Sequence, residues 1–124
     1  MLRKATDART REFAWGGMEW LFSGEPDEPL ALSTGKMLIR AGHENDLHRH
    51  SNCEEVLHLV SGQLLQKVGD AEYRMESGDT AFIPVGAAHR SRALGPSDAV
   101  VLVSYSAARR EYEALQDTSA GREG

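Results

Sequence analysis

Two histidines separated by one residue, His48 and His50, constrain the fold of this chain more than any other feature. Side chains at positions i and i+2 point the same way only in an extended strand, because a helix would turn one ring roughly 200° from the other. A strand-forming run follows, Glu55-Val56-Leu57-His58-Leu59-Val60, and ends at the turn signal Ser61-Gly62. The stretch therefore predicts two histidines on one strand and a carboxylate at the start of the next.

A second stretch, from Gly78 to His89, gives this pair a chemical meaning. An isolated His-x-His pair more often lies on an ordinary protein surface than at a metal ion. The second stretch adds a glycine, the turn Pro84-Val85-Gly86 and a further histidine at the start of an extended run. Together the two stretches read G-x5-H-x-H-x4-E-x6-G and G-x5-P-x-G-x2-H, with residues 63–77 between them.

This pair of patterns resembles the two signature motifs of the cupin family. The positions that fall at the family's spacing are Gly42, His48, His50, Glu55, Gly62, Gly78, Pro84, Gly86 and His89. One position departs, since the family pattern has an asparagine where this chain has Ala93. The resemblance implies a small cupin-type β-barrel or jelly roll. It also implies that one divalent transition metal is bound by His48, His50, Glu55 and His89.

The implied ligands are three imidazoles and one carboxylate. These donors suit divalent Fe, Mn, Ni, Co, Cu or Zn, and all six remain candidates. Four protein ligands on an octahedral ion leave two positions for water, substrate or dioxygen. We expect a metal-dependent enzyme acting on a small oxygen-chelating organic substrate, either a dioxygenase or a redox-neutral lyase or isomerase. The alternative is a non-catalytic metal- or small-ligand-binding cupin, such as a sensor or storage barrel.

Residues beside the two motifs leave alternatives open. Glu54 would exchange roles with Glu55 if the alignment slipped by one residue, although the spacing to the next glycine favours Glu55. Cys53 either shares the face of Glu55 near the metal or is a small half-buried residue in the loop before the strand. His58 has the opposite parity from Glu55, so we expect it on the outer face or at a subunit contact. His43 lies in a polar turn outside the site.

Strand parity predicts a pocket lining that is mostly apolar. The expected lining residues are Met37, Ile39, Leu57, Leu59, Tyr73, Met75 and Phe82, with Gln66, Ser91 and Tyr105 as polar candidates. Plain core packing is the alternative for each of them taken singly. No cluster of lysine or arginine falls on this face, which argues against a sugar phosphate or another polyanion. We therefore expect a small molecule that chelates the metal through one or two oxygens.

The remaining sequence predicts an all-β domain with one short C-terminal helix. Many short strands separated by Gly- and Pro-bearing turns are typical of a small barrel or jelly roll. Ser106 is a suitable N-cap, and good helix formers follow it up to Gln116. We expect a flexible N-terminal arm over residues 1–12, the cupin barrel with its helix over residues 13–116, and a disordered tail over residues 117–124.

The composition argues against several classes of function. The formal net charge is −5 and the basic residues are scattered, so nucleic acid is not an expected partner. The strongest apolar run, residues 99–103, is far shorter than the roughly 20 residues that span a bilayer. Residues 1–7 lack the apolar core of a signal peptide. We expect a cytoplasmic protein with no membrane partner, and its single cysteine, Cys53, fits a reducing compartment.

The cupin resemblance also implies a homodimer. Trp15, Trp20 and Leu21 are interface candidates, since aromatic anchors are favoured at such contacts. The near-continuous apolar run over residues 99–105 predicts a strand buried on both faces, between the barrel interior and a partner subunit.

Overall fold

The computed structural model describes residues 1–24 and 28–116, and almost all of its regular structure is β-strand. The single helical element in this part of the chain is a 3₁₀ turn, η1 (Ala5–Asp7). The strands are β1 (Arg9–Phe13), β2 (Gly16–Phe22), β3 (Ser33–Ile39), β4 (His48–Arg49), β5 (Glu55–Ser61), β6 (Leu64–Val68), β7 (Ala71–Met75), β8 (Thr80–Ile83), β9 (His89–Ala93), β10 (Ala99–Tyr105) and β11 (Glu113–Ala114). The predicted all-β class is confirmed.

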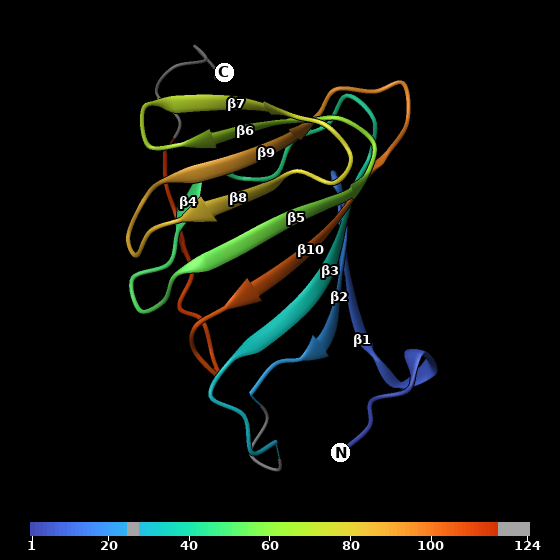
Figure 1. Ribbon diagram of the computed structural model, residues 1–124, viewed down its shortest axis with the longest axis vertical. Coiled ribbons are helices and arrows are strands. Elements are labelled where there is room, and N and C mark those ends of the chain that lie inside the picture. The colour runs from blue at the N-terminus through green and yellow to red at the C-terminus, as the bar shows by residue number, and fades with distance from the viewer. Residues whose placement is uncertain (25–27, 117–124) are drawn as a thin grey trace.

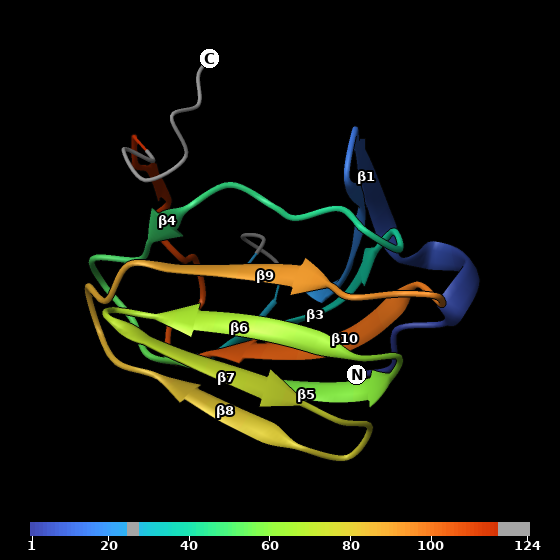
Figure 2. The same cartoon turned by 90° about the horizontal axis from the view of Figure 1, so that it is seen from above.

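The strands form two antiparallel sheets that lie face to face (Figures 1 and 2). The order is β1-β2-β3-β10-β5-β8 in the first sheet and β11-β4-β9-β6-β7 in the second. Neighbours in these orders are often distant in sequence, since β10 lies between β3 and β5. This crossing topology brings segments from both halves of the chain to one end of the molecule.

The core lies between the sheets, because each central strand alternates inward and outward residues. Strand β10 buries Val101, Val103 and Tyr105 and turns Leu102 outward, where 39% of its surface is exposed. These inward side chains pack in one cluster with residues of the second sheet such as Leu64. Within this chain the strand predicted to be buried on both faces is therefore covered on its inner face alone.

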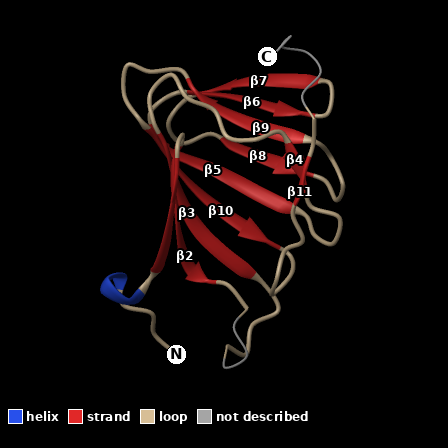
Figure 3. Ribbon diagram, turned by 180° about the vertical axis from the view of Figure 1, so that it is seen from behind, coloured by secondary structure: helices blue, strands red, loops and turns tan. Residues whose placement is uncertain are grey.

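The predicted C-terminal helix is wrong, because residues 106–116 contain no helix: residues 106–109 form bends, and the chain then reaches β4 at β11 (Figure 3). Strand β11 pairs with β4 within this segment. The Asn52 amide donates to the Arg109 carbonyl at 2.8 Å, and its oxygen accepts from the Glu111 N–H at 2.8 Å. A helix this short is marginal by itself, so hydrogen bonds to the rest of the fold outweigh its helix propensity.

The N-terminal boundary also differs from the prediction. Residues 9–12, predicted to belong to a flexible arm, lie in β1, which pairs with β2 from Arg9↔Trp20 to Phe13↔Gly16. The predicted tail over residues 117–124 lies outside the described residues. Among the described residues no helix has the length and hydropathy that crossing a bilayer requires.

Candidate metal centre

Three histidine rings converge at one end of the space between the sheets. His48 and His89 begin β4 and β9 and face each other across these strands, and their ring centroids are 4.1 Å apart. His50 follows β4, with its ring centroid 5.0 Å from each of the other two. One ring nitrogen from each of the three lies within 4.8 Å of the others, and all three residues are buried. This arrangement has the size of a metal site.

The backbone fixes the orientation of each ring. In every case Nδ1 faces a carbonyl oxygen: Asp46 at 2.6 Å for His48, Glu111 at 2.8 Å for His50 and Ala87 at 2.9 Å for His89. A carbonyl can only accept, so each contact favours the tautomer that carries its proton on Nδ1. The Nε2 lone pair is then free for a metal ion, which is the usual arrangement of metal-binding histidines.

The Glu55 carboxylate completes the cluster. Strand β5 starts at Glu55, whose Oε1 lies 3.3 Å from His50 Nε2 and 3.1 Å from His89 Nε2. These three atoms are buried and lack a well-directed hydrogen bond within the described part of the chain. With protons on both Nδ1 atoms, two lone pairs face a carboxylate oxygen, which is unfavourable unless a cation lies between them. The four residues therefore fit a divalent cation.

Electrostatics keep His48 and Glu55 in the protonation states that metal ligands need. Burial, and next the neighbouring His89 ring, lower the pKa of His48 from 6.5 to about 3, so the imidazole is neutral. Burial disfavours the Glu55 carboxylate, but protons on Nε2 of His50 and His89, or a cation in their place, favour it, and its pKa is lowered to about 2. Neutral imidazoles and an ionised carboxylate are the forms that bind metal.

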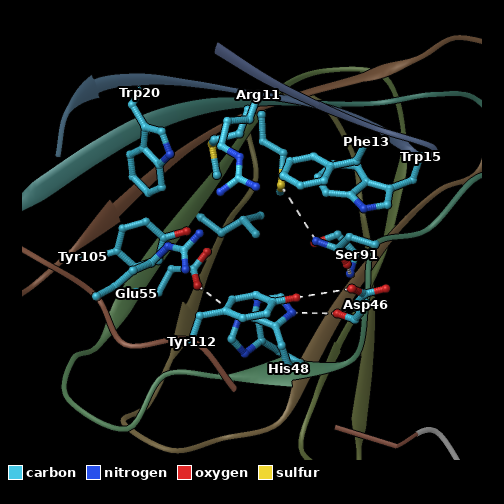
Figure 4. Close-up of a pocket in the computed structure, with 16 residues that line it drawn as sticks. Arg11, Phe13, Trp15, Trp20, Asp46, His48, Glu55, Ser91, Tyr105 and Tyr112 are labelled. Carbon is cyan, nitrogen blue, oxygen red and sulfur yellow. Dashed lines mark hydrogen bonds and ion pairs between the residues drawn. The ribbon is translucent and has the colours of Figure 1, made fainter. Parts of the chain in front are cut away.

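A cavity of about 400 Å³ opens beside this cluster (Figure 4). His48, Glu55 and His89 form part of its wall. Four of the ten residues predicted to line a pocket also do so, namely Met37, Leu57, Ser91 and Tyr105. The volume lies within the range of small-molecule sites.

Four other predicted lining residues are buried in the core and are absent from the cavity wall: Ile39, Leu59, Gln66 and Met75. Ser91 connects the two groups, because its hydroxyl donates to the Gln66 side-chain oxygen at 2.5 Å. Gln66 therefore supports a cavity residue from behind and does not reach the cavity.

The prediction is wrong for the last two lining residues, Phe82 and Tyr73, since both are more than half exposed. Phe82 is 55% exposed because Ala81 and Ile83 are the inward residues of β8, so the assumed parity was off by one. Tyr73 lies opposite buried Gln66 and has the expected parity, but β7 is the outermost strand of its sheet. Tyr73 is consequently 51% exposed.

The structure also places the residues whose roles were open. Glu54 is exposed and Glu55 is buried in the cluster, so the motif spacing selected the inward carboxylate. Cys53 is free and buried, and burial raises the pKa of its thiol. His58 points outward and its Nδ1 lies 2.8 Å from the Thr80 hydroxyl, while His43 is exposed.

Sequence reasoning missed the cavity walls that come from outside the motifs. The β1–β2 hairpin contributes Arg11, Phe13, Trp15, Met18 and Trp20, and the extended C-terminal segment contributes Arg110 and Tyr112. Trp15 and Trp20 thus line the cavity, and their contact with a second subunit stays a prediction. A partial signal was present, because Arg11 and Phe13 are spaced by two and share one side of β1, whereas Trp15 lies in the turn that follows.

Comparisons with known proteins agree with this fold. A family model described as a cupin domain matches residues 35–105. Oxalate decarboxylase of Lactobacillus farciminis in a formate complex superimposes with a TM-score of 0.80 at 22% identity, over 89% of this chain and 34% of that one. A variant of the Bacillus subtilis enzyme gives 0.80 at 17% identity, over 90% of this chain and 31% of that one. An oxalate oxidase gives 0.73 at 20%, over 82% and 55%.

A curated relative is also similar in sequence. The uncharacterized protein MJ1618 of Methanocaldococcus jannaschii is 25% identical over 63 residues, which is 51% of this chain and 50% of that protein. The chain thus matches about half the length of this relative and about a third of the decarboxylases. At these identities the solved structures establish the shared fold.

Proposed function

This chain belongs to the cupin family, and from that premise we propose that it is a metal-dependent enzyme acting on a small organic substrate that chelates the metal through oxygen. The reaction class is that of a dioxygenase or of a redox-neutral lyase or isomerase. The main support is that Nε2 of His50, Nε2 of His89 and Oε1 of Glu55 are buried without hydrogen-bond partners among the described residues and lie close together beside a cavity.

The proposed ligands are His48, His50 and His89 through Nε2, and Glu55 through its carboxylate. A divalent ion held there would supply Lewis acidity and a binding position for substrate oxygen. The ligand residues lie in β4, β5 and β9 and just after β4, and the cluster borders the cavity through His48, Glu55 and His89. A substrate in the cavity would therefore meet the cluster on this side.

The chain's own residues shape the cavity. The Tyr112 ring stacks on His48, with centroids 4.7 Å apart and planes at 22°, and lines the cavity as well. Met37 and Leu57 supply apolar wall. Burial, and next the Glu55 charge, raise the pKa of Tyr105 well above its usual value, so its hydroxyl remains protonated and able to donate a hydrogen bond.

The test combines metal content with turnover. We expect about one divalent ion per chain in the purified protein, falling below about a tenth of that in His50→Ala and Glu55→Ala. His58→Ala is the matched control, since that histidine lies on the outer face. Elemental analysis measures the metal, and oxygen uptake and product formation are followed with diketones, catechols, small acids and uronates.

The outcomes separate the proposal from its rival. Turnover that persists in His50→Ala and Glu55→Ala would contradict a role for the metal. Binding of these compounds to metal-loaded protein without product formation would favour a non-catalytic sensor or storage cupin. Oxygen uptake would favour the dioxygenase over the lyase or isomerase.

We also propose the cytoplasm as the location of the protein. Cys53, the one cysteine of the chain, is free and buried, and this suits a reducing compartment.

A further inference from the structure

We propose that the substrate is an organic anion: a flat apolar body with a carboxylate or phosphate group that Arg110 and Arg11 bind in the cavity. This inference rests on the proposed function in so far as it takes that cavity as the substrate site. It corrects the expectation of a lining free of arginine, because both side chains belong to segments outside the motifs.

Arg110 is held in a fixed orientation by aromatic rings. Its guanidinium carbon lies 5.0 Å from the ring centroid of Trp20, 5.3 Å from that of Tyr105 and 5.2 Å from that of Tyr112. Rings at these distances attract the cation and restrict its motion. The guanidinium is therefore positioned before any ligand arrives.

The same side chain has unused hydrogen-bonding capacity. Arg110 Nε is buried and has no hydrogen-bond partner, and no carboxylate of residues 1–24 or 28–116 lies within 4 Å of the guanidinium. Buried donors are almost always paired in folded proteins. The planar donor fork of arginine matches carboxylate and phosphate oxygens, so a bound oxyanion would satisfy this group.

Arg11 supplies a second cation from the opposite terminal part of the chain. Its side chain points from β1 toward the middle of the cavity (Figure 4). The guanidinium lies 5.5 Å from the Phe13 ring centroid, and no carboxylate of the described chain pairs with it. Two arginines without carboxylate partners thus face one cavity.

The carboxylates that line the cavity do not cancel the attraction of the two arginines for an anion. Glu55 is turned toward His50 and His89, and Asp46 is exposed, with its Oδ2 3.5 Å from the Tyr112 hydroxyl. The two arginine charges balance these two carboxylates. A bound divalent cation would then leave the cavity with a net positive charge, which favours an anion.

A groove that adjoins the cavity is also basic. An adjoining groove shares Arg11, Trp20 and Arg110 with the cavity and is lined in addition by Arg9 and Arg109. Charges of one sign along such a path raise the local concentration of a ligand of opposite sign. An anionic substrate would be drawn along this groove.

The walls between the charged groups suit a flat apolar body. Phe13 and Trp15 stack with centroids 4.9 Å apart and planes at 6°, and they present an extended aromatic surface. Trp20, Tyr105 and Tyr112 line the cavity as well. Rings and planar aliphatic groups pack well on such surfaces.

The test measures binding of benzoate, phenyl phosphate and the uncharged isostere benzamide to metal-loaded protein by calorimetry. We expect at least one of the two anions to bind more tightly than benzamide. Arg110→Gln should weaken that anion about ten- to a hundred-fold and leave benzamide nearly unchanged, and Arg110→Lys should retain part of the affinity. Arg11→Gln provides a second variant, because exposed Arg11 can be replaced without disturbing the core.

Arg74→Gln is the matched control, because this substitution removes the same charge at an exposed position on β7, in the second sheet. The preferred anion identifies the group as carboxylate or phosphate. Equal binding of anions and benzamide, or unchanged anion affinity in both cavity variants, would overturn the inference. The metal content of the same samples separates the two proposals: metal bound with arginine-independent binding sinks this inference alone, whereas arginine-dependent anion binding without metal sinks the metal centre alone.

Discussion

At the scale of single residues, His50 depends on a part of the chain far from the motifs. Asp46 and Ala87 carbonyls orient His48 and His89 from two residues upstream, so those contacts are local. The partner of His50 is the Glu111 carbonyl, 61 residues away. Motif spacing could identify the inward-facing residues because parity is local, but it could not identify this contact, which depends on tertiary structure.

The pKa of His48 makes the stability of the metal-free protein depend on pH. In the unfolded chain this histidine has its ordinary pKa of 6.5, and in the folded chain about 3. Below pH 6.5 the unfolded state therefore binds a proton that the folded state excludes, and the free energy of unfolding falls. Glu55 acts in the same direction between pH 4.5 and about 2, because its stabilising ionised form is lost there.

We expect the free energy of unfolding of metal-free protein to fall by on the order of 2 kcal/mol between pH 6.5 and 5, since one pKa unit corresponds to about 1.4 kcal/mol. Urea unfolding at several pH values measures this slope. His48→Gln should flatten it and His43→Gln, at an exposed position, should not. An unchanged slope in His48→Gln would show that other groups control the acid sensitivity.

At the scale of elements, the β1–β2 hairpin and the C-terminal segment decide the shape of the cavity. Short strands flanked by turn residues could be predicted for the central part of the chain, where alternation is clear. The C-terminal segment could not, because its helix-forming residues are held extended by partners such as Asn52 and by pairing with β4. Local propensity is weak against such contacts.

Asn52 tests whether this segment supports the metal centre. Asn52→Ala removes two hydrogen bonds to the backbone of Arg109 and Glu111 and should lower the free energy of unfolding by about 1–2 kcal/mol. Metal affinity should fall as well, because the Glu111 carbonyl orients His50. Thermal unfolding and metal titration measure the two effects.

Ser51→Ala is the matched control for this segment. The Ser51 hydroxyl donates to the Glu111 side chain at 2.6 Å and leaves its backbone contacts alone, so this variant should have a smaller effect. Equal metal affinity in Asn52→Ala and wild type would mean that His50 keeps its orientation without the segment.

At the scale of the whole molecule, the cupin fold was predictable from motif spacing, but its exposed surfaces were not. Whether a strand residue faces solvent depends on which strands end a sheet, as Tyr73 on β7 shows. The outer face of the first sheet carries exposed apolar residues on adjacent strands: Leu38, Val56, Phe82 and Leu102. We propose that this face joins two copies of the chain in a homodimer.

Sedimentation velocity tests the dimer. We expect a particle of about twice the chain mass of 13.6 kDa, and Phe82→Glu should shift it to a single chain, because a charge would then be buried in the contact. Tyr73→Glu changes a similarly exposed aromatic residue on the other sheet and should leave the dimer intact. A wild-type particle of one chain mass at micromolar concentration would contradict the proposal.

The division of labour between the motif strands and the two terminal segments has a consequence for how such a protein diversifies. The metal-binding residues and the part of the cavity wall formed by the β1–β2 hairpin are encoded in separate stretches, so replacing the hairpin can alter ligand selectivity while the metal centre is kept, whereas the C-terminal segment also orients His50. An engineer could therefore exchange the β1–β2 hairpin to change ligand selectivity and keep the metal-binding strands unchanged.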